Sequence, residues 1–364
     1  SDTITIGASG DTVNVVGTLQ NNGGSLAGVT FKEGGTNFTN SLLVGTDGTG
    51  TLSSADGNTG VGTGVLAALT SGDNNVAIGI CALKVNTTGS TNTAIGKESM
   101  DANTTGSNNV ALGKGSLSSN TTANDNTGIG FNALSANTTG TENVAMGRDA
   151  LKVNTTASYN TAVGFEALHD NTTGSDNTAF GDSALHKITT GTCNVSVGSY
   201  SLLTNTTGDK NTAIGRSALQ ANTTANNNTA VGFSALMTNT TGADNSAIGY
   251  RALCVNTTGA SNVAMGYEAL VANTTAIDNT AVGFRTLGSN TTGTRNTAMG
   301  TSALCSNTTA SDNTAFGRCS LRKTTTGCQN TAIGKDSLIC NTTGDNLVAV
   351  GFGALRCNTT ADNN

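Results

Sequence analysis

The chain has 364 residues, with 48 glycines, no proline and no tryptophan, and its formal net charge is −6. Only 35% of the residues are hydrophobic and 11% are charged, against roughly 45–50% and ~25% in ordinary soluble domains. No run of about 18 apolar residues is present, which excludes a transmembrane helix. No basic block is present, which argues against nucleic-acid binding. Collagen is excluded because it needs proline and a glycine at every third position.

Residues 1–57 are predicted to form an irregular, β-rich shaft segment. Residues 3–7 and 12–17 alternate apolar and polar side chains as β-strands do, and Gly-Asp and Asn-Gly-Gly turn signals separate such stretches. Because the chain begins without Met and ends inside a repeat, we expect it to be a fragment of a longer protein.

From residue 58 to residue 364, one 17-residue unit recurs in 18 registers without an insertion. A full unit reads NTAIGKESMDANTTGSN over residues 92–108. The invariant glycine of the unit defines a glycine column, which consists of Gly62, Gly79, Gly96, Gly113, Gly130, Gly147, Gly164, Gly181, Gly198, Gly215, Gly232, Gly249, Gly266, Gly283, Gly300, Gly317, Gly334 and Gly351. Each copy of the unit therefore faces nearly the same environment.

Other positions of the unit are almost as regular and define further columns. The small-residue column, two before each glycine, is Ala, Gly or Ser, and the apolar column, one before it, is Ile, Val, Leu, Met or Phe. The leucine column, four after the glycine, is Leu in every copy except Met100. Asn fills the first asparagine column, four before the glycine, except at Leu347. It also fills the second, seven after, except at Leu69, Ile188 and Thr324.

The period of 17 is too short for helical repeats, which need ~33–47 residues, and predicts an all-β fold, a parallel β-solenoid or β-roll. The Thr/Val-Ala-Ile/Val-Gly segment is the expected strand, and Thr-Thr-Gly/Ala a second short strand. We expect the apolar column and the threonine column, three before the glycine, to point inward with the leucine column. The small-residue column would then point outward. Asn and Thr side chains are expected to bond along the stack, which at ~4.8 Å per coil would be about 85 Å long.

The Asn-Thr-Ala-Ile-Gly, Ala-Leu and Asn-Thr-Thr-Gly motifs resemble the head repeats of trimeric autotransporter adhesins. Over residues 58–364 they are more similar to repeats of long phage tail fibres, which often carry an endosialidase-type chaperone domain after them. Residues 1–57 resemble the irregular shaft that precedes such repeats. The resemblance implies an elongated homotrimer of parallel β-rolls on a virion tail fibre or at a cell surface, with a host glycan or protein as receptor. It implies neither nucleic-acid binding nor membrane insertion.

The stripe column, one residue after the glycine, is a candidate surface or interface stripe. Aromatic and basic side chains together could bind sugars by stacking and charge, or could pack locally at a subunit interface. Local packing is favoured because four of the five Ala-containing units, at Ala123, Ala157, Ala225 and Ala276, precede a Phe in this column, whereas Ala310 precedes Arg318. The stripe includes Phe131, Phe165, Phe233, Tyr250, Tyr267, Phe284, Phe352, Arg148 and Arg216, with Lys97, Lys114, Arg318 and Lys335 in the same column.

Histidine, cysteine and the sequons offer weaker candidates. His169 and His186 are 17 residues apart and should stack, which makes them a weak metal-binding pair, although an exposed pair without metal is the favoured interpretation. Cys340 and Cys357 share a column in adjacent coils, within the range of a possible disulfide. The other cysteines are expected to be free thiols. The fifteen Asn-Thr-Thr sequons are interpreted as turn or ladder residues rather than glycan acceptors.

No catalytic constellation is found, so the sequence predicts a structural protein without a cofactor. Carboxylates are scattered, and no Ser/His/Asp or phosphate-loop arrangement is present. The leading hypothesis is a fibre shaft that presents a host-binding tip. The alternatives are a bacterial surface adhesin, a self-assembling extracellular filament and an ice-binding solenoid. The ice-binding solenoid is disfavoured because we expect only one Thr column to face outward.

Overall fold

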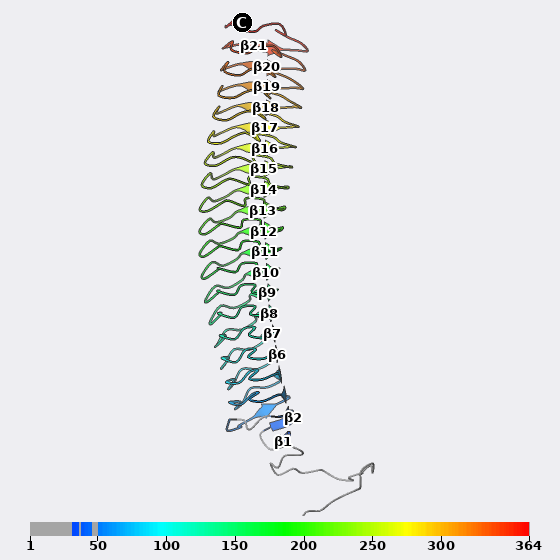
Figure 1. Ribbon diagram of the computed structural model, residues 1–364, viewed down its shortest axis with the longest axis vertical. Helices are drawn as coiled ribbons and strands as arrows, with labels where there is room; N and C mark the ends of the chain where they lie inside the picture. Colours follow the sequence, from blue (N-terminus) through cyan, green and yellow to red (C-terminus); the bar gives the residue numbers. More distant parts are fainter. Residues whose placement is uncertain (1–30, 36–37, 46–49, 364) are drawn as a thin grey trace, which may run out of the picture.

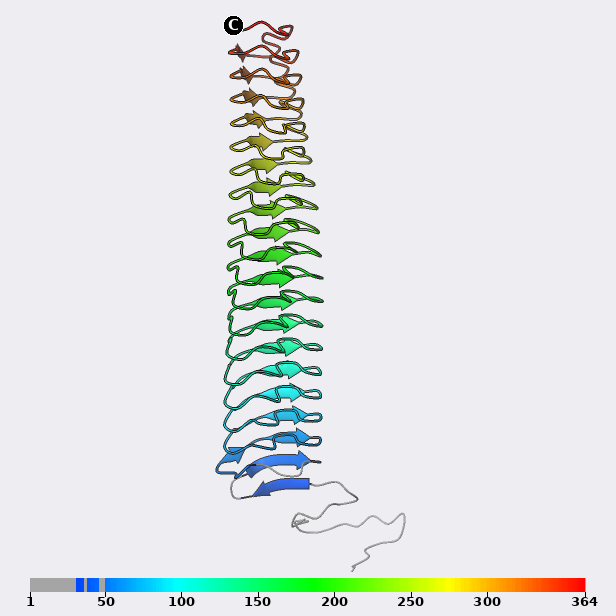
Figure 2. The ribbon, with the colours of Figure 1, turned by 60° about the vertical axis from the view of Figure 1, so that its left-hand side comes forward.

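The computed structural model describes residues 31–35, 38–45 and 50–363 of the chain. The strands predicted at 3–7 and 12–17 lie outside these residues. In the described part the protein is an all-β parallel β-solenoid, as predicted, with one 17-residue coil for each copy of the repeat. Figures 1 and 2 show the coils stacked one on another in a single elongated rod, with the strands on one side of the stack.

Short strands build one continuous sheet along the rod. Most consist of three residues that end immediately before the glycine column. The strands are β1 Phe31–Gly35, β2 Phe38–Val44, β3 Ala55–Asp56, β4 Thr59–Val61, β5 Val76–Ile78, β6 Thr93–Ile95, β7 Val110–Leu112, β8 Thr127–Ile129, β9 Val144–Met146, β10 Thr161–Val163, β11 Thr178–Phe180, β12 Val195–Val197, β13 Thr212–Ile214, β14 Thr229–Val231, β15 Ser246–Ile248, β16 Val263–Met265, β17 Thr280–Val282, β18 Thr297–Met299, β19 Thr314–Phe316, β20 Thr331–Ile333 and β21 Val348–Val350.

From β4 to β21 each strand pairs in parallel with the next, and equivalent residues stand opposite one another, as Ala162 does with Ala179. At the N-terminal end of the stack β2 continues the same register, with Leu43 opposite Gly60. β1 then pairs with β2 in the antiparallel direction. The edge of the sheet at this end is therefore covered by a strand that runs against the others.

The predicted orientation of the repeating strand was wrong. The small-residue column is fully buried, whereas most side chains of the apolar column are exposed, as Ile214 (41%) is beside the buried Ala213. The threonine column is half-buried and shares the outward face, because successive residues of a strand alternate between its two sides. The leucine column is buried, as predicted.

The interior of the coil has room only for a small side chain opposite the leucine column, which is Ala in most coils and Ser at position 196. At Gly128, one of the two glycines of the small-residue column, an added Cβ would lie 2.6 Å from Ser116 Oγ and 3.3 Å from Leu117 Cγ. The core therefore consists of one Leu per coil packed among Ala, Ser and Asn side chains. A column that varies from Val to Phe in volume fits the surface and not this core.

Two asparagine ladders run through the buried interior, and they confirm that Asn side chains bond along the stack. In the first asparagine column, Asn75 Oδ1 accepts hydrogen bonds from the backbone N–H of Asn92, at 3.0 Å, and Asn75 Nδ2 donates to Asn58 Oδ1. In the second, Asn103 Nδ2 donates to Asn86 Oδ1 at 2.7 Å and to a carbonyl of its own coil at 2.9 Å. Buried amides are thus satisfied by equivalent amides one coil away.

The Thr-Thr segment bonds from coil to coil but is not the second strand that the sequence predicts. The Thr87 backbone N–H and hydroxyl both donate to the Thr104 carbonyl, at 2.9 and 3.0 Å. The chain turns too often here for a strand: each coil also has left-handed corners, for example at Ser217 and Leu219, with φ of 57° and 50°. The glycine column forms another corner, with φ of 132° at Gly215.

Candidate functional site

The stripe column lies on the surface of the rod, and its rings are accessible. Six of the seven aromatic side chains are 42–47% exposed, and Phe352, near the C-terminal end of the described chain, is 73% exposed. Arg148 and Arg216 are exposed as well. The stripe is therefore a surface feature of the single chain, which leaves both of its predicted roles, ligand contact and subunit contact, open.

Four rings of the stripe form a continuous stack over four successive coils. The ring centroids of Phe233 and Tyr250 are 5.6 Å apart, those of Tyr250 and Tyr267 5.0 Å, and those of Tyr267 and Phe284 5.2 Å. The interplanar angles are 11–14°. The parallel register of the sheet imposes this spacing, and each inner ring has a neighbour on both faces.

Elsewhere in the stripe, cations replace rings. Lys114 Nζ lies 5.7 Å from the centroid of Phe131, and Arg148 Cζ lies 5.6 Å from that of Phe165. Lys335 Nζ lies 5.4 Å from the centroid of Phe352. In each pair the cation comes from the preceding coil. In these three pairs, cations and aromatic rings of the stripe therefore contact each other through cation–π interactions.

Local packing accounts for part of the stripe. In the four coils with a Phe at 131, 165, 233 or 284, the apolar-column residue two positions earlier is half-buried rather than exposed. In the coils of Tyr250, Tyr267 and Phe352 it is exposed, and in the coil of Lys97 it is half-buried. These four Phe residues are those that follow an Ala-containing turn, as the sequence pattern indicated.

The predicted histidine pair does stack. The rings of His169 and His186 are nearly parallel, with centroids 5.1 Å apart. His169 Nδ1 lies 2.6 Å from Asp170 Oδ1, and His186 Nε2 lies 3.2 Å from Glu166 Oε2. Because the two rings are parallel and stacked face to face, their nitrogen atoms do not converge on a common point. Within the described ranges, no group of three or more His, Cys, Asp or Glu residues is placed to hold a metal ion.

The predicted disulfide is not formed. Cys340 and Cys357 occupy one column of adjacent coils, but both are free thiols in the structure. Cys357 is exposed and Cys340 half-buried. All eight cysteines of the chain are free, including the buried Cys254 and Cys319.

The sequon asparagines are structural in the described coils. Asn86, Asn103 and their equivalents as far as Asn341 are fully buried, and their Nδ2 atoms donate to ladder partners. A glycan on such a nitrogen would break the ladder and has no room inside the coil. Only Asn358, in the last coil, is partly accessible.

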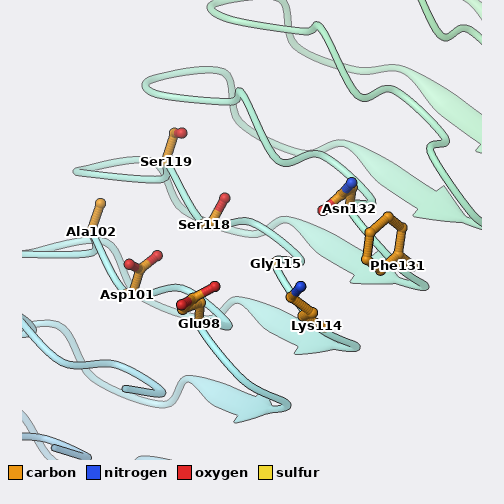
Figure 3. Close-up of a pocket in the computed structure, with 9 residues that line it drawn as sticks. All are labelled: Glu98, Asp101, Ala102, Lys114, Gly115, Ser118, Ser119, Phe131 and Asn132. Atoms are coloured by element: carbon orange, nitrogen blue, oxygen red, sulfur yellow. The ribbon is translucent and has the colours of Figure 1, made fainter. Parts of the chain in front are cut away.

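A groove of about 620 Å³ crosses three coils beside the stripe (Figure 3). Its lining consists of Glu98, Asp101, Ala102, Lys114, Gly115, Ser118, Ser119, Phe131 and Asn132. The groove is open here because Gly115 has no side chain at a position, two after the glycine column, where most coils have one. Two coils further on, the Lys152 Nζ–Asp149 Oδ1 ion pair, at 3.2 Å, spans the equivalent place.

Charge in the groove is unevenly compensated. Burial raises the pKa of the Asp101 carboxyl, and the neighbouring charge of Glu98 adds to the increase. Glu98 Oε1 pairs with Lys97 Nζ at 3.3 Å, whereas the Asp101 carboxylate has no ion-pair partner among the described residues. The groove was not predicted from the sequence. The available signal was the glycine at position 115, in a position that is otherwise filled except at the two end coils.

Comparison with known proteins adds no family: no protein-family model matches the chain, and no curated protein does either. The described part of the chain contains no helix long and apolar enough to cross a membrane.

Proposed function

We propose that the chain is the shaft of a homotrimeric fibre of the phage tail-fibre type, which holds a host-binding tip away from the virion. Residues 58–364 act as a stiff spacer, and the receptor is a glycan or protein on the host surface. The role requires neither catalysis nor a cofactor. The unbroken ladder of equivalent coils supports it, because a stack in which each coil contacts only its neighbours is inherently rod-shaped.

One observation carries the proposal: the apolar column lies on the outside. Side chains such as Ile214, Ile248 and Met265 are 39–41% exposed, and the column continues on one face from β4 to β21. Exposed apolar surfaces of this extent mark interaction sites. A second copy of the chain carries the same column at the same spacing, so parallel copies would cover it along the whole rod.

The energy of such packing accumulates with length. Full burial of a Val, Leu or Ile side chain contributes about 1.5–3 kcal/mol, so covering one that is about 40% exposed contributes on the order of 1 kcal/mol. Repetition over eighteen coils makes the association strong even though each contact is small.

Measurement of the mass in solution tests the proposal. We expect three times the chain mass of 36.1 kDa by light scattering or sedimentation. The double variant Ile214→Lys/Ile248→Lys places six charges in the proposed interface and should dissociate the trimer. The matched control, Thr207→Lys/Thr241→Lys on the exposed Thr-Thr segment, should not. A monodisperse monomer of the unaltered chain would refute the proposal, and growth in mass with concentration would favour a self-assembling filament.

A bacterial surface adhesin would use the same architecture. Sequencing of the gene distinguishes the two: an encoded chaperone domain of the endosialidase type would support a tail fibre, and an encoded membrane anchor would support an adhesin.

Ice binding is a second candidate because the threonine column faces outward and not inward. Thr212, Thr229 and their equivalents share the flat outer face of the sheet with the apolar column. The bulky Phe180 and Phe316 interrupt its flatness. Thermal hysteresis of the monomer would support this function, and its absence at high concentration would remove it.

A further inference from the structure

We propose that the groove over Gly115 is a glycan-binding site on the side of the rod, which takes one or two pyranose rings of a neutral or amine-bearing sugar. This activity adds a lateral contact to the proposed spacer role, and it does not depend on how many chains associate.

The size and position of the groove suit such a ligand. Small-molecule sites in proteins commonly measure about 300–1,000 Å³, and the groove measures about 620 Å³. Gly115 lies on the middle coil, Glu98 and Asp101 on the preceding coil, and Phe131 on the following coil (Figure 3). The ligand would therefore touch three coils at once.

The lining offers both kinds of contact that a sugar makes. Carboxylate oxygens of Glu98 and Asp101 accept hydrogen bonds from hydroxyl groups, and a bond to a charged acceptor is stronger than one between neutral groups. The Ser119 hydroxyl, which bonds to no other described residue, and the Asn132 amide add polar contacts. Phe131, 42% exposed, supplies an apolar wall for the C–H face of the ring.

Charge sets the class of sugar. The Glu98 carboxylate of the groove is paired with Lys97 Nζ at 3.3 Å, and the ammonium of Lys114 faces the ring of Phe131 rather than a carboxylate. Asp101 is left without an ion-pair partner in the described chain. A ligand amine would be attracted here, whereas an acidic sugar would meet like charge.

The four-ring stack from Phe233 to Phe284 is less suited to bind a sugar. Its rings lie 5.0–5.6 Å apart and cover one another's faces, so mainly their edges are presented. Phe131, in contrast, stacks on no other ring within the described residues, and only the flexible side chain of Lys114, which also lines the groove, lies over it.

The structure offers a precise way to close the groove. Asn132 occupies the same position as Gly115 one coil later, with a φ of 54°, so an Asn is compatible with this left-handed corner. An added Cβ at Gly115 would meet only Asn132 Oδ1, the far end of a flexible side chain, at 2.7 Å. Gly115→Asn should therefore fill the groove and leave the rod intact. Gly64→Asn, at the equivalent position outside the groove, is the matched control.

The experiment titrates the full chain with N-acetylglucosamine, glucosamine and N-acetylneuraminic acid, followed by saturation-transfer NMR. We expect single-site binding of the first two sugars and no binding of the acidic one. Gly115→Asn should weaken binding at least tenfold, Asp101→Asn should weaken glucosamine binding about tenfold, and Gly64→Asn should leave both unchanged. Circular dichroism and solution mass, measured on the same samples, show whether the fold and the assembly are kept.

Several results would overturn the site. The first is the absence of saturation transfer to any of the three sugars. The second is sugar binding that is undiminished in both the Gly115→Asn and the Asp101→Asn variants. The third is preferential binding of N-acetylneuraminic acid. Tighter binding of N-acetyl-lysine amide than of either sugar would assign the groove to a protein partner instead. A loss of the trimer with unchanged sugar binding would count against the fibre proposal alone.

Discussion

Asn171 Oδ1 is buried without a hydrogen-bond partner because Ile188, one coil further along the second asparagine ladder, has no amide to donate. In intact parts of the ladder this bond is present, as between Asn171 Nδ2 and Asn154 Oδ1 at 2.9 Å. The same gap occurs at Asn307 Oδ1, which faces Thr324. Two of the three unpartnered buried side-chain atoms of the described chain therefore lie where the repeat deviates from its own pattern.

Thr324→Asn should stabilise the protein by about 1–2 kcal/mol, because it would supply a donor for Asn307 Oδ1 and an acceptor for Asn341 Nδ2. At present Asn341 Nδ2 donates to the Gly344 carbonyl at 3.0 Å, but along the ladder it reaches only Thr324 Oγ1, at 3.5 Å. The urea midpoint measures the effect. Ile188→Asn should increase the stability less than Thr324→Asn does, because it also removes a buried apolar side chain. A midpoint that falls in Thr324→Asn would show that the ladder does not contribute to stability.

Asn239→Ala, in an intact stretch, should destabilise the rod by about 2–4 kcal/mol. The change removes donation from Asn239 Nδ2 to Asn222 Oδ1 at 3.1 Å and to Gly242 O at 2.8 Å. It also removes the Asn239 Oδ1 acceptor of Asn256 Nδ2, which keeps only its bond to the Gly259 carbonyl. Because each coil contacts only its neighbours, amide exchange should accelerate most near this coil. Thr241→Ala, two residues away and exposed, should have little effect, and equal effects of the two changes would argue against a specific role of the ladder.

Periodicity was sufficient to predict the solenoid, the length of the coil and the ladders. A fixed step of 17 residues without an insertion predicts coils that stack in register, which places the Asn side chains of successive copies next to one another. The buried Leu was predicted for the same reason: Leu recurs in seventeen copies.

Hydrophobicity alone misled the orientation of the strand. The apolar column was placed inside because Ile and Val are usually buried. The variation in side-chain volume within a column was the better signal. A narrow core accommodates the small-residue column, with Ala213 and Ala230, but it cannot accommodate a column that has Val231 in one coil and Phe180 in another. The groove was missed because it depends on a single absent side chain at Gly115, and only the three-dimensional stack shows which residues surround that gap.

Gly232→Ala and Gly242→Ala should differ sharply although both add one methyl group. Gly232 has a φ of 137°, and its added Cβ would lie 2.7 Å from the carbonyl carbon of Gly249, so we expect a loss of about 3 kcal/mol or more. An added Cβ at Gly242 would also lie against a carbonyl, that of Gly259, but Gly242 has no left-handed φ, and the coil already accommodates Ala at the equivalent position, as at Ala225 and Ala276. Its replacement should cost less than about 1 kcal/mol. Thermal unfolding compares the two; equal losses would show that the corner is not strained by a side chain.

Asp101 and Asp149 should make opposite contributions to the pH dependence of stability. Burial raises the pKa of Asp101. Burial would also raise the pKa of Asp149, but hydrogen bonds from Lys152, Asn132 and Arg148 outweigh it and lower that pKa. A carboxyl whose pKa is raised by folding disfavours the folded state once it is ionised, and one whose pKa is lowered favours it.

Asp101→Asn should therefore raise the free energy of unfolding at pH 7, and this gain should disappear as the pH falls below the unfolded-state pKa of about 3.9. Asp149→Asn should lower it at pH 7. That loss should shrink as the pH falls from about 3.9 through the folded-state pKa, where the wild-type carboxylate also loses its charge. Urea unfolding of both variants between pH 2.5 and pH 7 measures the two differences from the unaltered chain. The two differences should have opposite signs at neutral pH and should both approach zero in acid. Differences of the same sign would contradict the assignment of Asp101 as a carboxylate without an ion-pair partner and of Asp149 as one stabilised by its hydrogen bonds.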